Sequence, residues 1–309
     1  MIPVAPQPMN EQSESSPPDS LFELLNRSCR CISTDPEALE RETERVLRES
    51  HIRLPAWAST NVFAVAPVFV SPEHVRNMRE VVSAATALTQ SPSYHAMALE
   101  RAPEIARHPV AHRSVFFGYD FHLGVNGPAL IEINTNAGGA MLNSLLARAQ
   151  KPCCEEVSQF VASADRVEAL DASLVQMFQD EWELARGNQP LGTIAIVDDV
   201  PESQFLYPEF VLFRELFRQA GLEAFICGPE QLRFESSGLY LENRRVDLVY
   251  NPRGDRPTQA RCSLLRVQRG GPIDGRSIVQ RADNELPNAR WRLRVCLYAG
   301  GPRLLQIPV

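Results

Sequence analysis

The 309-residue chain is long enough for two domains, or for one large α/β domain with appendages. Its apolar fraction of 44% allows most of it to bury a core. The net charge of −7 gives no general attraction to nucleic acid or to an anionic membrane, and no apolar run approaches the roughly 20 residues that span a bilayer.

Residues 1–20 are predicted to form a disordered tail. They lack the basic start and the apolar stretch of a secretory signal. The seven cysteines form no CxxC pair and have no histidine at zinc spacing, which indicates reduced thiols and a cytoplasmic protein. Cys29 and Cys31 allow a metal or redox pair, but small apolar residues near a helix end are the simpler interpretation.

Helical spacing of apolar residues predicts helix within Leu21–His51. The apolar run Asn61–Val70 predicts a buried strand, although Pro67 interrupts it. Ser71 is a good helix N-cap and Pro72 suits the first helical position, so we expect a helix from Pro72 through Val82.

The middle of the chain predicts a β-hairpin over Ser114–Asn134 and a helix beginning near Ala140. Cys154–Arg186 carries an apolar stripe that predicts one or two amphipathic helices. Near Arg186–Pro190 the helical pattern gives way to alternating strands and helices, which suggests a domain boundary.

After that boundary the sequence predicts a small Rossmann-like, parallel-sheet unit. Its elements alternate as strand, helix, strand, hairpin and strand, at Thr193–Val200, Tyr207–Ala220, Leu222–Cys227, Leu232–Asn243 and Val246–Asn251. From Pro252 onward the pattern is aperiodic and rich in arginine. Eleven arginines against four acidic residues give residues 252–309 a charge of +7 and leave −14 for the rest. A basic nucleic-acid arm is one interpretation, but aromatic residues are not interleaved with the arginines.

The hairpin places polar side chains on one face of its first strand. Gly118, Asp120 and His122 share that face, while Phe117, Tyr119, Phe121 and Leu123 share the other. On the second strand Leu130, Glu132 and Asn134 are predicted to share a face. A three-residue loop, Val125-Asn126-Gly127, would pair Gly124 with Pro128 and therefore Asp120 with Glu132.

Two facing carboxylates on a half-buried sheet repel each other, and a divalent cation between them removes that penalty. Oxygen ligands shared with nucleotide phosphates suit Mg²⁺. The alternative is a solvent-facing polar strand with no metal.

The strand leads into Thr135, Asn136, Ala137, Gly138 and Gly139, immediately before an apolar helix. Backbone N–H groups at a helix N-terminus favour anions, although an ordinary strand-to-helix turn has the same appearance.

Together, Asp120, Glu132 and Asn134 followed by Thr135-Asn136-Ala137-Gly138-Gly139 resemble the signature of ATP-grasp ligases. That resemblance implies that Asp120 and Glu132 hold one Mg²⁺, and that Glu132 and Asn134 hold a second. It implies ATP as cofactor, a carboxylate activated as an acyl phosphate, and capture by an amine or similar nucleophile. The loop of Thr135, Asn136, Gly138 and Gly139 would contact ATP or the substrate.

The signature precedes the Rossmann-like unit, an order that resembles circularly permuted, glutathionylspermidine-synthase-like ATP-grasp proteins. We therefore expect an α/β protein with α+β elements. It would combine a partial ATP-grasp fold over residues 21–190 with a Rossmann-like subdomain over residues 191–251. Small-molecule substrates are expected as partners, without nucleic acid or membrane.

The resemblance also implies a subdomain whose lysines or arginines bind the α- and β-phosphates of ATP. The sequence shows no segment that fits this subdomain. Lys151 is the only lysine, and it lies in a loop-like segment. We expect the native reading frame to end near Asn251, through a frameshift or truncation, so whether the chain is an enzyme stays open. The alternative is an incompetent remnant that binds at most a metal or a partner; a basic-tailed interaction protein is a third.

Minor candidates remain at four positions. His122 is either a ligand or a hydrogen-bonded strand residue, and Arg113 is either a phosphate ligand or a surface arginine. Asp198 and Asp199 follow a predicted strand, where they either bind substrate or cap a turn. The absence of GxGxxG and Walker A motifs argues against a dinucleotide dehydrogenase or a P-loop NTPase.

Overall fold

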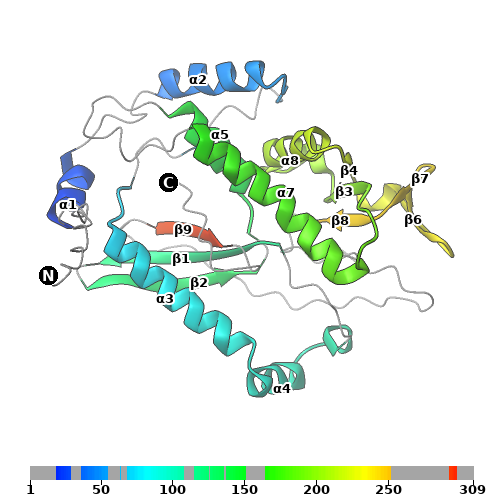
Figure 1. Ribbon diagram of the computed structural model, residues 1–309, viewed down its shortest axis with the longest axis horizontal. Coiled ribbons are helices and arrows are strands. Elements are labelled where there is room, and N and C mark those ends of the chain that lie inside the picture. The colour runs from blue at the N-terminus through cyan, green and yellow to red at the C-terminus, as the bar shows by residue number, and fades with distance from the viewer. Residues whose placement is uncertain are drawn as a thin grey trace, which may run out of the picture.

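A computed structural model describes residues 19–28, 36–54, 63, 68–107, 115–124, 126–135, 137–150, 164–251 and 292–297. The protein is a mixed α/β structure with parallel and antiparallel sheets (Figure 1). Its helices are α1 (Asp19–Ser28), α2 (Pro36–Glu49), α3 (Pro72–Thr89), α4 (Pro92–Glu100), α5 (Ala140–Ala149), α7 (Ala164–Arg186) and α8 (Tyr207–Gln219).

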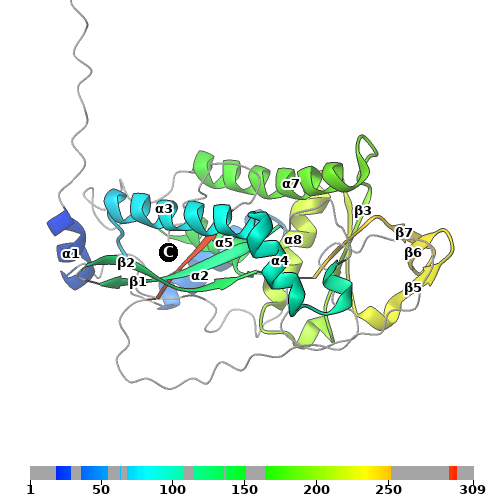
Figure 2. The same ribbon diagram turned by 90° about the horizontal axis from the view of Figure 1, so that it is seen from below.

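The strands are β1 (Phe117–Gly124), β2 (Gly127–Asn134), β3 (Thr193–Val197), β4 (Glu223–Cys227), β5 (Leu232–Glu235), β6 (Gly238–Leu241), β7 (Arg244–Val246), β8 (Leu248–Tyr250) and β9 (Arg292–Leu297). They form three three-stranded sheets, in the orders β2-β1-β9, β4-β3-β8 and β5-β6-β7. The β5-β6-β7 sheet lies at one end of the molecule and α1 at the other (Figure 2).

Helix α3 begins as its sequence predicts. Ser71 is the N-cap and its hydroxyl accepts a hydrogen bond from the N–H of His74 at 3.2 Å, with Pro72 in the first turn. The same Ser-Pro pair starts α4, where Ser91 accepts from the N–H of Tyr94. Helix α3 covers one face of the β1–β2 hairpin, where Met78 and Val82 pack against Tyr119 and Phe121.

The strand expected over Asn61–Val70 is wrong for Val68–Val70, which form no ladder. The side chain of Asn26 takes the place of a neighbouring strand there. Its amide nitrogen donates to the Phe69 carbonyl at 2.8 Å, and its Oδ1 accepts from the Phe69 N–H at 2.7 Å. The polar backbone of Phe69 is therefore satisfied without a sheet. The rest of that range, apart from Phe63, lies outside the described residues.

The Rossmann-like order is confirmed, because β3 pairs in parallel with both β4 and β8, and α8 connects β3 to β4. Strand β3 ends at Val197, three residues earlier than expected. Helix α8 stops before Gly221, which adopts φ 82°. The hairpin turning at 236–238 forms β5 and β6 as predicted, and β7 extends it.

One core joins the parallel sheet to the helices before it. Phe116, Phe178, Phe213, Phe217 and Tyr250 form a set of ring contacts with centroid distances from 4.9 to 6.2 Å. Helices α5 and α7 both contribute residues to this core, and both are seen in Figure 1. Arg148 on α5 links the two helices. Its guanidinium donates to Ser144 on the same helix at 2.8 Å and to Asp171 on α7 at 2.5 Å.

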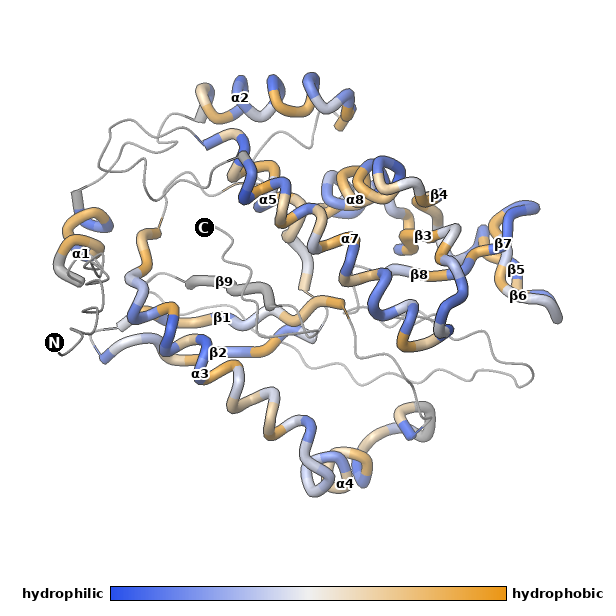
Figure 3. The backbone as a smooth tube through the Cα atoms, in the orientation of Figure 1, coloured by the Kyte–Doolittle hydropathy of each residue, from blue (hydrophilic) through white to orange (hydrophobic). Residues whose placement is uncertain are grey.

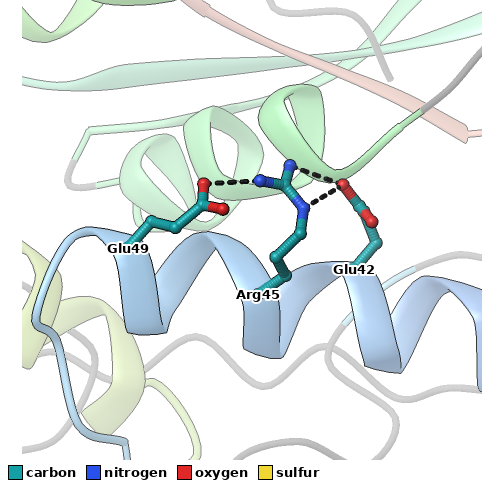
Figure 4. A network of polar contacts seen from close by, with 3 residues as sticks. All are labelled: Glu42, Arg45 and Glu49. Carbon is teal, nitrogen blue, oxygen red and sulfur yellow. Dashed lines mark hydrogen bonds and ion pairs between the residues drawn. The ribbon is translucent and has the colours of Figure 1, made fainter.

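Helix α2 is amphipathic and lies at the surface (Figure 3). On its polar side Arg45 donates to Glu42 at 2.7 Å and to Glu49 at 2.5 Å (Figure 4). Such exposed pairs contribute little to stability. The buried side of α2 includes Leu39 and Val46.

Residues 252–309 were expected to be aperiodic, yet Arg292–Leu297 form β9, which pairs antiparallel with β1. This segment, RLRVCL, alternates arginine with apolar residues, a period-2 pattern too short to stand out in the sequence. The remainder of the tail and residues 1–18 lie outside the described residues.

Candidate functional site

Asp120 and Glu132 are paired across the hairpin, as the sequence predicts. The route to this pairing differs from the expected one. Gly124 pairs with Gly127, one residue earlier than expected, and the register shifts between Asp120 and Phe121. Ile131 is the extra residue, so β2 carries a β-bulge. The bulge, rather than the length of the loop, brings Glu132 opposite Asp120.

The bulge also separates two residues that were expected to share a face. Leu130 pairs with Phe121 and packs in the cluster beneath α3, so its predicted place beside Glu132 is wrong. Paired residues of a sheet point to the same side, so Asp120 and Glu132 share the other face. Helix α3 covers the apolar face only.

The two carboxylates differ in exposure. Asp120 is buried, with 4% of its surface exposed, whereas Glu132 is exposed. The amide nitrogen of Asn134 donates to Glu132 Oε1 at 3.2 Å. This bond leaves the carbonyl oxygen as the atom that Asn134 would offer to a cation. Two carboxylates and an amide oxygen are hard ligands, a donor set that fits Mg²⁺.

Strand β9 adds arginine positions beside this pair. In the backbone register Arg294 is opposite Asp120, and Arg292 is opposite His122. Strand β1 is therefore the central strand, with Glu132 paired to Asp120 on one side and Arg294 on the other. The sequence does not predict these neighbours, because the tail shows no period long enough to indicate a strand.

The loop after β2 connects the hairpin to α5. Thr135 is exposed in a turn and Asn136 lies outside the described residues, whereas Gly138 and Gly139 are partly buried. Gly139 is the residue before the first turn of α5, with φ 105° and no side-chain cap. An alanine there would be strained, which accounts for this glycine.

Glu209, from the first turn of α8, binds the start of α5. Its Oε2 accepts from the Gly139 N–H at 2.6 Å and its Oε1 from the Met141 N–H at 3.2 Å. Glu209 is fully buried, and burial raises its pKa to about 7 against the opposing effect of the Gly139, Met141 and Ala140 N–H groups. Sequence reasoning missed it, since an acidic residue in a first helical turn usually serves its own helix dipole.

The minor candidates fall in separate places. His122 is half-buried at the β1 position next to Asp120 on the same face. The N–H of Asp199 donates to Asp198 Oδ1 at 2.8 Å, as expected for a residue that caps the turn after β3. Arg113 and Lys151 lie outside the described residues.

Cys227 is a free thiol buried in β4, and burial raises its pKa to about 12, with a smaller effect from the charge of Glu230. It therefore stays protonated at neutral pH.

Within the described ranges no three His, Cys, Asp or Glu side chains gather where they would hold a metal. Asp120 and Glu132 supply two carboxylates, so a metal at the hairpin would need Asn134 and ligand oxygens as well. Among the residues that the structure describes, no helix has the length and hydrophobicity to cross a membrane.

No protein-family model and no curated protein matches the sequence. Among solved structures, the chain is similar to the apo form of a glutathione synthetase-like effector from Globodera pallida, at 12% sequence identity and a TM-score of 0.43. The match covers 71% of this chain and 57% of the effector, so the chain spans little more than half of that protein's length. A likeness at this level says nothing about activity.

Proposed function

We propose that the protein is an ATP-grasp-type ligase that uses Mg²⁺ and ATP to activate a carboxylate as an acyl phosphate, which an amine or similar nucleophile then captures. The observation that carries the proposal is the pairing of Asp120 with Glu132, with Asn134 hydrogen-bonded to Glu132 on the same face. The resemblance of this segment to the ATP-grasp signature supports it. A cytoplasmic location and small-molecule substrates stay predictions.

In this proposal Asp120, Glu132 and Asn134 hold Mg²⁺, which when bound offsets the charge of the ATP phosphates. Buried Asp120 supplies a fixed carboxylate, and exposed Glu132 supplies one that solvent and ligand can reach. Asn134 orients the Glu132 carboxylate through its amide N–H. The Thr135–Gly139 loop stays the predicted contact for ATP or substrate. Since Glu209 accepts from the Gly139 N–H, Thr135, Asn136 and Gly138 are the members of the loop proposed to donate to a ligand.

Calorimetric titration with ATP in the presence and absence of Mg²⁺ tests the proposal. We expect Mg²⁺-dependent binding that Glu132→Gln weakens by about tenfold or more, a loss of about 1.4 kcal/mol per tenfold. Glu80→Gln, the same charge change at an exposed site on α3, is the matched control and should bind like the wild type. Binding that Glu132→Gln leaves unchanged would place the nucleotide elsewhere.

The second candidate is an incompetent remnant of the same fold, and two observations favour it. The backbone register puts a basic residue type at the cross-strand position opposite Asp120, so the facing carboxylates are weaker evidence for a metal. The Gly139 and Met141 N–H groups already bind a carboxylate of the protein. A folded wild type that binds no ATP at any Mg²⁺ concentration would favour this candidate.

A further inference from the structure

The carboxylate of Glu209 fills a position that a side chain of the loop would normally occupy. Helix α5 has a glycine before its first turn and therefore no N-cap side chain of its own. Glu209 lies 70 residues further along the chain and supplies that cap from α8. The bond to Gly139, at 2.6 Å, is at the short end for an N–H···O hydrogen bond.

Close packing at Gly138 also keeps the loop against the start of α8. A Cβ on Gly138 would lie 2.7 Å from Leu206 Cδ1 and 3.1 Å from Glu209 Oε2. The loop and the first turn of α8 therefore approach more closely than any side chain would permit. Both glycines of the signature are thus explained by the protein's own packing and backbone conformation.

The anchored loop is short. Only three residues separate Asn134, the last residue of β2, from Gly138, so a fixed Gly139 limits where the end of β2 can lie. Glu132 and Asn134 belong to that end of the strand. The unit that contains α8 is therefore tied to the two candidate metal ligands through one buried carboxylate.

We propose that Glu209 is a positioning residue, which fixes the loop between Asn134 and α5 and thereby the place of Glu132 and Asn134. This inference rests on the proposed function for its effect on ATP, but not for its effect on the hairpin. Glu209 touches neither the candidate metal ligands nor a ligand in this arrangement, so its influence passes through the backbone of residues 135–139.

The electrostatic surroundings of Glu209 make this coupling depend on pH. The first turn of α5 carries no acidic residue. Burial raises the Glu209 pKa and the backbone N–H groups lower it, and no charged side chain among the described residues contributes to the shift. On α8 itself the nearest charged groups, Arg214 and Glu215, are more than one turn away and are paired with each other. Ionisation strengthens the individual bonds to Gly139 and Met141, but burial is the larger effect on the Glu209 pKa, so the anchored arrangement is more stable while the carboxyl is protonated.

Amide hydrogen exchange on the ligand-free chain tests the positioning role directly. For Glu209→Gln we expect protection to fall by tenfold or more at Gly139 and Met141, and also at Glu132 and Asn134. Glu215→Gln, on the same helix and paired with Arg214 and Arg218, is the control and should match the wild type. A loss confined to residues 139–141, or no loss at all, would overturn the proposal.

Titration with Mg²⁺ and ATP at pH 6 and pH 8 adds a readout that a merely structural role would not move. We expect the affinities of the wild type and of Glu215→Gln, each divided by that of Glu209→Gln at the same pH, to fall between pH 6 and pH 8. The ratio removes the titration of ATP itself. Glu209→Asp, which keeps the charge, should restore part of the pH dependence. A folded Glu209→Gln chain with the wild-type pH profile would overturn the coupling to ATP. If the wild type binds no ATP, the proposed function fails, whereas the exchange experiment still decides the role of Glu209.

Discussion

Gly138 illustrates at the scale of one residue why the loop after β2 is rich in small residues. A side chain there meets Leu206 and Glu209, both at the start of α8. Gly139 is constrained differently, by a positive φ rather than by a neighbour. The two glycines that drew attention as a candidate anion loop therefore have separate structural causes, and neither cause requires a ligand.

Replacing Gly138 by alanine should destabilise the protein by about 1–3 kcal/mol, because the new methyl group overpacks against the Leu206 side chain. Urea denaturation measures the change in the free energy of unfolding. Leu206→Ala in the same chain should recover most of that cost, since it removes the atom 2.7 Å from the new Cβ. Equal losses with and without Leu206 would show that backbone strain, not packing, is responsible.

At the scale of elements, the link between α8 and α5 should give the protein a distinct pH dependence. Burial raises the pKa of Glu209 from 4.5 to about 7. A raised carboxyl pKa contributes stability that is fully present below pH 4.5 and is lost as pH rises through 7. The loss amounts to roughly 3 kcal/mol for a shift of this size.

Glu209→Gln should therefore lose this component. The difference in unfolding free energy between wild type and Glu209→Gln should move in favour of the variant between pH 4.5 and pH 7, and stay level above about pH 8. Denaturation of both chains at pH 5 and pH 8 measures it. A constant difference across this interval would contradict the assigned cause of the pKa rise.

The sequence predicted those elements that depend on neighbouring residues alone. Ser71 and Pro72 predicted the start of α3, and the alternation around Asp120 predicted the hairpin. The bulge at Ile131 was not predictable, because it depends on Leu130 entering the cluster beneath α3. Strand β9 and the cap from Glu209 were missed because both are contacts between distant segments. The cap leaves no periodic pattern, and the alternation in β9 is too short to stand out. Asn61–Val70 was misread where Asn26 satisfies the backbone of Phe69.

At the scale of the whole molecule, one hydrophobic core crosses the boundary expected near Arg186–Pro190. Phe116 and Phe178 precede the boundary, Phe213 and Tyr250 follow it, and their rings are in contact. The division into residues 21–190 and 191–251 stays a prediction about topology. In packing terms the two parts share their buried aromatic residues, so we expect them to unfold together.

Truncating Phe178 tests this shared core, because its fully buried ring touches four other aromatic rings. Phe178→Ala should cost about 3–5 kcal/mol. It should also lower the transition midpoint equally when helix content is followed by circular dichroism and when exposure of the buried Cys227 thiol is followed by labelling. Two separate transitions, with only one moved by the substitution, would indicate independent cores.

Asp120, Glu132 and Asn134 are proposed to hold a divalent cation together with ATP. Paramagnetic Mn²⁺ in place of Mg²⁺ tests this, since Mn²⁺ broadens the amide signals of residues near the bound ion. With ATP present, we expect selective broadening at Asp120, Glu132 and Asn134 in the wild type, and its loss in Glu132→Gln. Broadening centred elsewhere, or the same pattern in the variant, would contradict it.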